Sequence, residues 1–139
     1  MARYYVKTIL LLMLLASCAP TTVGELQQNG KSHSWSLSGK YTDIGSCLIK
    51  WLETNDPGHT DLTTGIGFGL QYREYTGQRY VEIHQRPNNS QYLYVLTLEY
   101  ITDNKTRAHL LSEPYGYDWR HKALKPGLKQ CSSRISKSM

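Results

Sequence analysis

The chain has 139 residues, a length that suits one folded domain and argues against several. Its formal net charge of +5 is uneven: residues 18–118 hold eight Lys or Arg and eleven Asp or Glu, whereas residues 119–139 hold six basic residues and no acid. A basic end suits anionic lipid headgroups, lipopolysaccharide or peptidoglycan carboxylates, although a solvated basic helix and tail has the same composition.

The first segment has the layout of an export signal. Two basic residues precede the apolar run 9–16, which is too short to span a bilayer because that takes roughly 20 apolar residues. The run ends on "LASC", residues 15–18, which resembles the lipobox of bacterial lipoproteins. We therefore expect residues 1–17 to be a signal peptide and Cys18 to be the first residue of the mature chain.

The lipoprotein resemblance implies lipidation of Cys18 by thioether-linked diacylglycerol, usually with an amide-linked fatty acid such as palmitate. Each buried methylene contributes about 0.8 kcal/mol, so several acyl chains hold a protein on a membrane essentially permanently. Ala19, rather than Asp, follows the cysteine. In the family this implies the periplasmic face of the outer membrane, where nucleic acid is not an expected partner. The alternative is an ordinary signal peptide that leaves Cys18 as a free thiol.

Two further cysteines, Cys47 and Cys131, follow the lipobox. In the oxidising envelope compartment that the resemblance implies, such a pair predicts a disulfide. By closing a long loop, the bridge is expected to stabilise the domain by about 4 kcal/mol in the chain-entropy account. Two unpaired buried thiols are the alternative.

The mature chain begins with a polar stretch, residues 18–33, that shows no apolar period and predicts a flexible tether. Alternating polar and apolar residues in 33–40 predict a half-buried strand. Residues 41–55 change to a period of three and four, which predicts an amphipathic helix. The residues on its apolar face are Ile44, Cys47, Leu48, Trp51 and Leu52.

Four more segments have strand patterns and are separated by short turns: residues 63–75, 79–86, 91–102 and 106–112. Strands that are joined by short turns form antiparallel sheets. Residues 118–131 predict a short helix interrupted by Pro126, and residues 132–139 predict a disordered basic tail.

These elements predict an α+β fold in two layers for the single domain, residues 34–131. The expected order is β-α-β-β-β-β-α, with an antiparallel sheet of about four to five strands and two helices on one face. The disulfide would join the two helices on the same side of the sheet. An architecture of this kind does not by itself transfer a function.

No catalytic signature is visible in the domain. The five histidines have no metal-ligand spacing, and no serine carries a nucleophile-elbow motif. The sequence therefore predicts no catalytic residue, no metal and no cofactor other than the lipid. The best candidate for binding is "YGYDWRH", residues 115–121, because Tyr, Trp and Arg are favoured at binding sites. The candidate binding residues are Tyr115, Tyr117, Trp119, Arg120, Lys122 and Lys125.

The favoured hypothesis is a non-enzymatic, lipid-anchored envelope protein that binds another envelope protein as an accessory or assembly factor. An alternative is a binding module for cell-wall glycan or lipopolysaccharide that uses the tyrosines and the basic C-terminal end. A second alternative is an enzyme whose site the sequence does not reveal.

Overall fold

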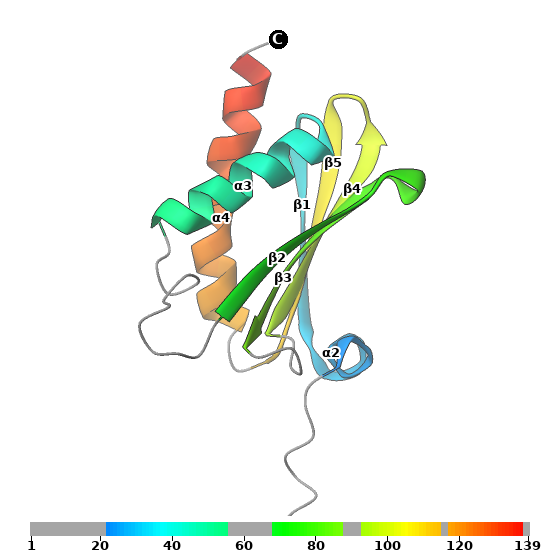
Figure 1. The fold of residues 1–139 in the computed structure, drawn as a ribbon, viewed down its shortest axis with the longest axis vertical. Helices are drawn as coiled ribbons and strands as arrows, with labels where there is room; N and C mark the ends of the chain where they lie inside the picture. The colour runs from blue at the N-terminus through cyan, green and yellow to red at the C-terminus, as the bar shows by residue number, and fades with distance from the viewer. Residues whose placement is uncertain (1–21, 56–67, 88–92, 115–116, 138–139) are drawn as a thin grey trace, which may run out of the picture.

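The computed structural model of the chain describes residues 22–55, 68–87, 93–114 and 117–137 (Figure 1). The expected signal peptide, the lipidation candidate Cys18 and the binding candidate Tyr115 lie outside these residues.

The centre of the fold is one antiparallel sheet of five strands in the spatial order β1-β5-β4-β3-β2 (Figure 1). The strands are β1 (Lys31–Ser38), β2 (Phe68–Tyr75), β3 (Tyr80–Pro87), β4 (Tyr94–Thr102) and β5 (Lys105–Ser112). Strands β2 to β5 pair in the order of the sequence, whereas β1 returns to pair with β5. Strands β1 and β2 are therefore the two edges of the sheet.

Two helices, α3 (Tyr41–Asn55) and α4 (Tyr117–Lys137), cover one face of this sheet, and the short helix α2 (Val23–Asn29) precedes β1. Helix α4 contacts β1, and α3 lies over β2, β3 and β4. The α+β class, the antiparallel sheet of about five strands and the two helices on one face are confirmed.

The core lies between the sheet and these two helices because each strand sends alternate side chains toward them. In register, Ile83 of β3 stands beside Leu96 of β4, which stands beside Leu110 of β5. The apolar face of α3 packs on this row. The fully buried side chains shared by the two layers are Ile44, Leu48, Leu52, Val81, Ile83, Leu96, Leu98, Leu110 and Leu124.

Two glycines set how closely the helices pack. A Cβ on Gly45 of α3 would lie 3.0 Å from Tyr72 Cε2 and 3.2 Å from Val81 Cγ1 of the sheet. A Cβ on Gly127 of α4 would lie 2.6 Å from Trp51 Cε3 and 2.8 Å from Leu48 Cδ1 of α3. Helix α4 therefore reaches α3 only because residue 127 has no side chain.

The predicted disulfide Cys47–Cys131 is present and joins α3 to α4, with an S–S distance of 2.08 Å. Near it, Trp51 Nε1 donates a hydrogen bond to Gln130 Oε1 at 2.9 Å. The covalent bond and the hydrogen bond together fix the two helices against each other.

The prediction of a short helix interrupted at Pro126 was wrong, because α4 is continuous to Lys137. Pro126 provides no N–H for the carbonyl of Lys122, but both residues are exposed, so water can bond that carbonyl. A disordered tail from residue 132 was also wrong as far as residue 137. Ser132 Oγ accepts a hydrogen bond from the Ser38 N–H at 2.9 Å and donates one to the Ser38 carbonyl at 3.0 Å.

The expected flexible tether over residues 18–33 is replaced, from residue 22 onward, by α2 and the start of β1. A capping box begins α2: Thr22 Oγ1 accepts a hydrogen bond from the Glu25 N–H, and Glu25 Oε2 accepts one from the Thr22 N–H. Leu26 is the buried residue of this helix, at 1% exposure. A single apolar contact gives no period in the sequence, which explains why the helix was not predicted.

Substitution Gly127→Ala is expected to lower the free energy of unfolding by about 1–3 kcal/mol through overpacking against Trp51 and Leu48. At an uncrowded helical position, the same change stabilises a helix by about 1 kcal/mol. Chemical denaturation of both proteins measures the difference. Gly24→Ala in α2 is the control, because its nearest neighbour would be Thr22 Oγ1 at 3.8 Å. A stabilising Gly127→Ala would contradict the close approach of the helices.

Candidate functional site

A groove lies between the edge strand β1 and helix α4, with a volume of about 470 Å³. Trp35 and Leu37 come from β1, and Leu128 comes from α4. Lys125 and Lys129 of α4 line the same groove. Its lining therefore combines apolar side chains with two cations, which suits a ligand that has both apolar and anionic groups.

The aromatic cluster beside this groove joins β1 to the start of α4. The rings of Trp35 and His121 stack with centroids 5.3 Å apart, and Tyr117 stacks on His121 at 5.8 Å. His33 meets both Trp35 and His121 edge-on at 4.6 Å. The Tyr117 hydroxyl donates a hydrogen bond to the Ser32 carbonyl at 3.3 Å. The cluster holds the first turns of α4 against β1.

Within the cluster, burial lowers the pKa of His121, and the neighbouring His33 and Lys125 lower it further. A neutral imidazole costs less to bury against aromatic rings than a charged one. His121 therefore acts as a packing residue within the cluster.

The candidate Arg120 is buried, at 6% exposure. Its Nη2 lies 3.0 Å from Glu113 Oε1, and its Nη1 donates a hydrogen bond to Ser112 Oγ at 3.2 Å. Arg120 thus ties the beginning of α4 to the end of β5, and its guanidinium is not presented to a partner.

The other candidates occupy different parts of the α4 surface. Tyr117 is half-buried in the aromatic cluster, and Trp119 is exposed at 54%. Lys122 and Lys125 are exposed, and of the two only Lys125 lines the groove. The predicted set is therefore divided, and a single surface made of all its members does not exist among the described residues.

Sequence reasoning did not propose Trp35 as a site residue, because the alternating pattern around it predicts only a half-buried strand. His121 ends the predicted stretch 115–121 and Lys129 belongs to the basic C-terminal end, but neither was among the candidate binding residues. The sequence contains no signal that places this strand beside α4, since Ser38 and its partner Ser132 are 94 positions apart and their contact is purely tertiary. The sequence shows the alternating pattern of β1 and the spacing of the lysines in α4. It does not show that this strand and this helix lie side by side.

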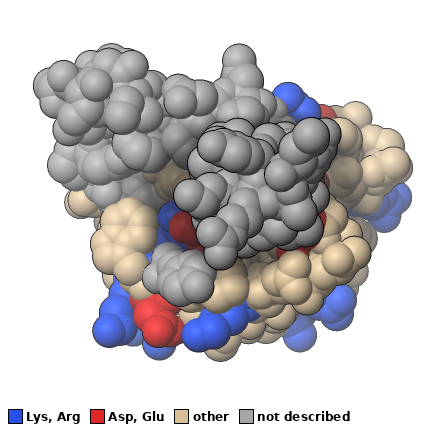
Figure 2. Space-filling view, turned by 90° about the horizontal axis from the view of Figure 1, so that it is seen from below, with Lys and Arg blue, Asp and Glu red and all other residues tan. Residues whose placement is uncertain are grey.

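Figure 2 views the molecule from the end at which α4 begins. Lys and Arg side chains lie along the margin of that end, with Asp and Glu between them (Figure 2). Among the α4 residues whose side chains are described, the exposed lysines are Lys122, Lys125 and Lys129, and the one acidic residue in the sequence of α4 is Asp118 in the first turn. Their charge is therefore available to an anionic partner.

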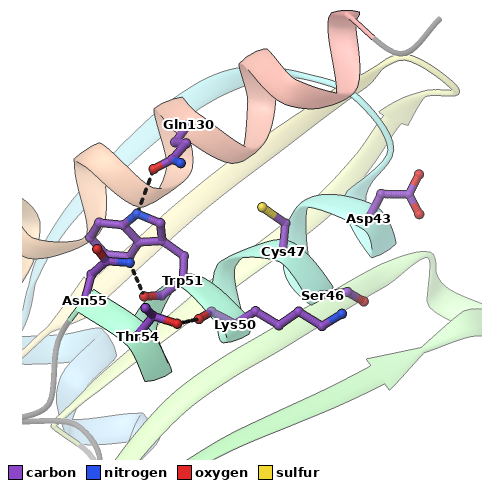
Figure 3. A pocket seen from close by; sticks show the side chains of 8 residues that line it. All are labelled: Asp43, Ser46, Cys47, Lys50, Trp51, Thr54, Asn55 and Gln130. Carbon is purple, nitrogen blue, oxygen red and sulfur yellow. Dashed lines mark hydrogen bonds between the residues drawn. The ribbon is translucent and has the colours of Figure 1, made fainter.

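A second hollow, of about 520 Å³, lies on the outer side of α3 (Figure 3). Its polar groups largely bond to the helices themselves: Thr54 Oγ1 donates to the Lys50 carbonyl and Asn55 Nδ2 to the Trp51 carbonyl, both at 2.9 Å. Trp51 is bonded to Gln130. The hydrogen bonds among its lining residues therefore stabilise α3 and its contact with α4.

Within the described ranges, no group of three His, Cys, Asp or Glu side chains is placed to hold a metal ion. In the same residues, no helix combines the length and the apolar character needed to cross a membrane. Comparison with known proteins gives no match to a protein-family model, to a curated protein or to a solved structure.

Substitution Arg120→Met is expected to lower the free energy of unfolding by about 3 kcal/mol, because it leaves Glu113 without its partner. Urea denaturation measures the loss. Lys122→Met, at an exposed position two residues away, should stay within about 0.5 kcal/mol of the parent. Equal effects of the two changes would show that the Arg120 ion pair is not structural.

The lowered pKa of His121 makes stability depend on pH. As the pH falls below about 6.5, the unfolded chain takes up a proton at this residue before the folded chain does, so this contribution to stability is full above that pH and is lost as the pH falls from there toward the lower folded pKa. Thermal unfolding between pH 7.5 and 5.5 should show a smaller loss in His121→Gln than in the parent. His109→Gln, on the opposite sheet face, serves as the control; an unchanged slope in His121→Gln would refute the assignment.

Proposed function

We propose that this chain is a non-enzymatic lipoprotein of the cell envelope whose α+β domain binds another envelope protein as an accessory or assembly factor. The observation that carries the proposal is the groove between β1 and α4, which has apolar side chains inside and exposed lysines at its side. Apolar contact with a polar and charged rim is the usual make-up of a protein-binding surface.

The proposal treats the domain as non-enzymatic because His121, a histidine with a lowered pKa, has a structural position. His121 is stacked between Trp35 and Tyr117, and its pKa is lowered by burial and by positive neighbours. A general base needs a reacting group within hydrogen-bond reach. Here the ring neighbours are aromatic and offer no nucleophile to activate.

Membrane attachment rests on the "LASC" sequence, with Cys18 as the lipidated residue and the outer membrane as the favoured location. The capping residue of α2, Thr22, is four residues after Cys18. Four residues span at most about 14 Å when fully extended. In this proposal, the domain is therefore held close to the lipid surface.

The alternative function, binding of cell-wall glycan or lipopolysaccharide, is favoured by one observation. Trp119 is exposed at 54% on a helix that also exposes Lys122. An exposed indole can stack on a sugar ring, and lysines attract phosphate or carboxylate groups. Such binding should weaken steeply as salt is added, because exposed charges are screened.

Cys18→Ala is expected to move the protein from the membrane fraction to the soluble fraction, because no acyl chain can then be attached. Fractionation of cells followed by mass spectrometry of the N-terminal peptide measures both the location and the lipid. The variant Cys47→Ala/Cys131→Ala should stay with the membrane, since it keeps the lipid site. Membrane attachment that persists in Cys18→Ala would disprove the lipoprotein assignment.

The partner class is tested by crosslinking in intact cells, followed by solubilisation and mass spectrometry of the captured material. A single dominant protein supports the accessory or assembly factor. Muropeptides or lipopolysaccharide without a protein would instead support the glycan-binding alternative.

A further inference from the structure

The outer edge of β1 is bonded to α4 at its two ends. The Tyr117 hydroxyl bonds to the Ser32 carbonyl, and Ser132 Oγ bonds to both backbone groups of Ser38. In an antiparallel strand, the N–H and C=O of one residue point to the same side, and the next residue points to the other. The backbone groups of Ser34 and Ser36 therefore point outward between these two contacts, away from β5.

Between the two contacts, the groove separates α4 from this edge. Trp35 and Leu128 supply apolar surface there, and the exposed side of β1 supplies backbone donors and acceptors. An extended peptide needs both: main-chain hydrogen bonds for affinity and side-chain contacts for selection. The groove has the composition of a site for one added strand.

The spacing of the lysines suits the side chains of such a strand. Lys125 and Lys129 are four residues apart on a helix, about 6 Å along its axis at 1.5 Å per residue. Alternate residues of a strand are about 6.6 Å apart and point to the same side. Because α4 contacts β1 at both ends, it runs beside the strand, and two carboxylates at alternate positions can each meet one lysine.

The charge of the region favours an acidic partner over a second copy of this chain. The ion pairs found in the described ranges are Arg107–Glu99 and Arg120–Glu113, so these lysines have no such partner there. Strand β1 has the sequence KSHSWSLS and carries no acid. Pairing of two β1 strands would therefore bring no carboxylate to Lys125 or Lys129.

We propose that the groove between β1 and α4 binds an extended acidic segment of the partner protein. The segment adds a strand to β1 through the backbone of Ser34 and Ser36 and places carboxylates from alternate positions on Lys125 and Lys129. This inference rests on the proposed function and identifies the site and the chemistry of the partner.

The direct test uses the full chain as isolated from cells, kept in nanodiscs. The probe is a nine-residue peptide of alternating Glu and Val, and its counterpart has Lys in place of Glu. Nuclear magnetic resonance should show shifts of the Ser34 and Ser36 amides, with slowed exchange, for the Glu peptide only. Shifts with both peptides, or none on β1, would overturn the proposal.

Charge reversal gives the matched comparison. Lys125→Glu/Lys129→Glu should weaken binding of the Glu peptide at least tenfold and make the Lys peptide the better ligand. Lys50→Glu/Arg73→Glu makes the same change in net charge on exposed residues of α3 and β2, and it should alter affinity less than twofold. An equal loss of affinity in both variants would show that binding depends only on the net charge of the protein, and it would overturn the proposed site.

Ser36→Pro tests the backbone contact. It removes an N–H that points away from β5, so the bonds between β1 and β5 are kept, and proline is tolerated on edge strands. A folded Ser36→Pro protein, checked by thermal melting, should lose binding of the Glu peptide. Unchanged affinity in that protein would contradict strand addition, and the lysine variants decide the question if it does not fold.

Photocrosslinkers at Ser36, Lys50 and Arg73 in intact cells separate the two proposals. Capture from Ser36 of a segment with acids at alternate positions supports the site. Capture of a protein only from Lys50 or Arg73, or of this same chain from Ser36, overturns the site and leaves the partner-binding function standing. No captured protein from any position would overturn the proposed function itself.

Discussion

The junction between α3 and α4 is the contact on which the rest of the structure depends. The disulfide Cys47–Cys131 and the close approach at Gly127 set how the helices lie on each other. Because α3 is also seated on the sheet at Gly45, the position of α4 follows from that of α3. The core beneath both helices is buried as a result.

The position of α4 in turn defines the edge of the sheet. Ser132 lies directly after Cys131, so the disulfide that joins the helices also places the hydroxyl that binds Ser38 of β1. At the other end, Arg120 and the aromatic cluster hold the first turns of the helix. The residues on either side of the open edge of β1 therefore stabilise the fold, and they also position this edge.

Local patterns predicted most of the fold. Helix α3 matches the expected bounds because its apolar period of three and four is undisturbed, and strands β3 and β5 fall within one residue of the predicted ranges. The predicted interruption at Pro126 was wrong because proline is tolerated on an exposed face of the helix. Helix α2 was not predicted because it depends on its caps and on a single buried leucine. The disulfide followed from the pair of cysteines together with the oxidising compartment that the lipoprotein resemblance implies.

The candidate site was less accessible to sequence reasoning. Lys125 was named, but Arg120 was taken for a binding residue because its burial against Glu113 depends on how α4 docks. Trp35 joins the groove only through the return of β1 to β5, a long-range pairing. Residue type predicted surface chemistry at single positions, and tertiary contacts decided which of those positions meet.

The place of α2 has a consequence for how this protein would meet a partner. If Cys18 carries the lipid, the capping residue Thr22 follows after four residues, and the domain cannot extend far from the bilayer. Its encounters are then confined to two dimensions, among molecules that share the same leaflet or rise directly from it. A partner anchored in that membrane would be met at a high effective concentration. The groove would then be largely occupied even if its affinity for the partner were low.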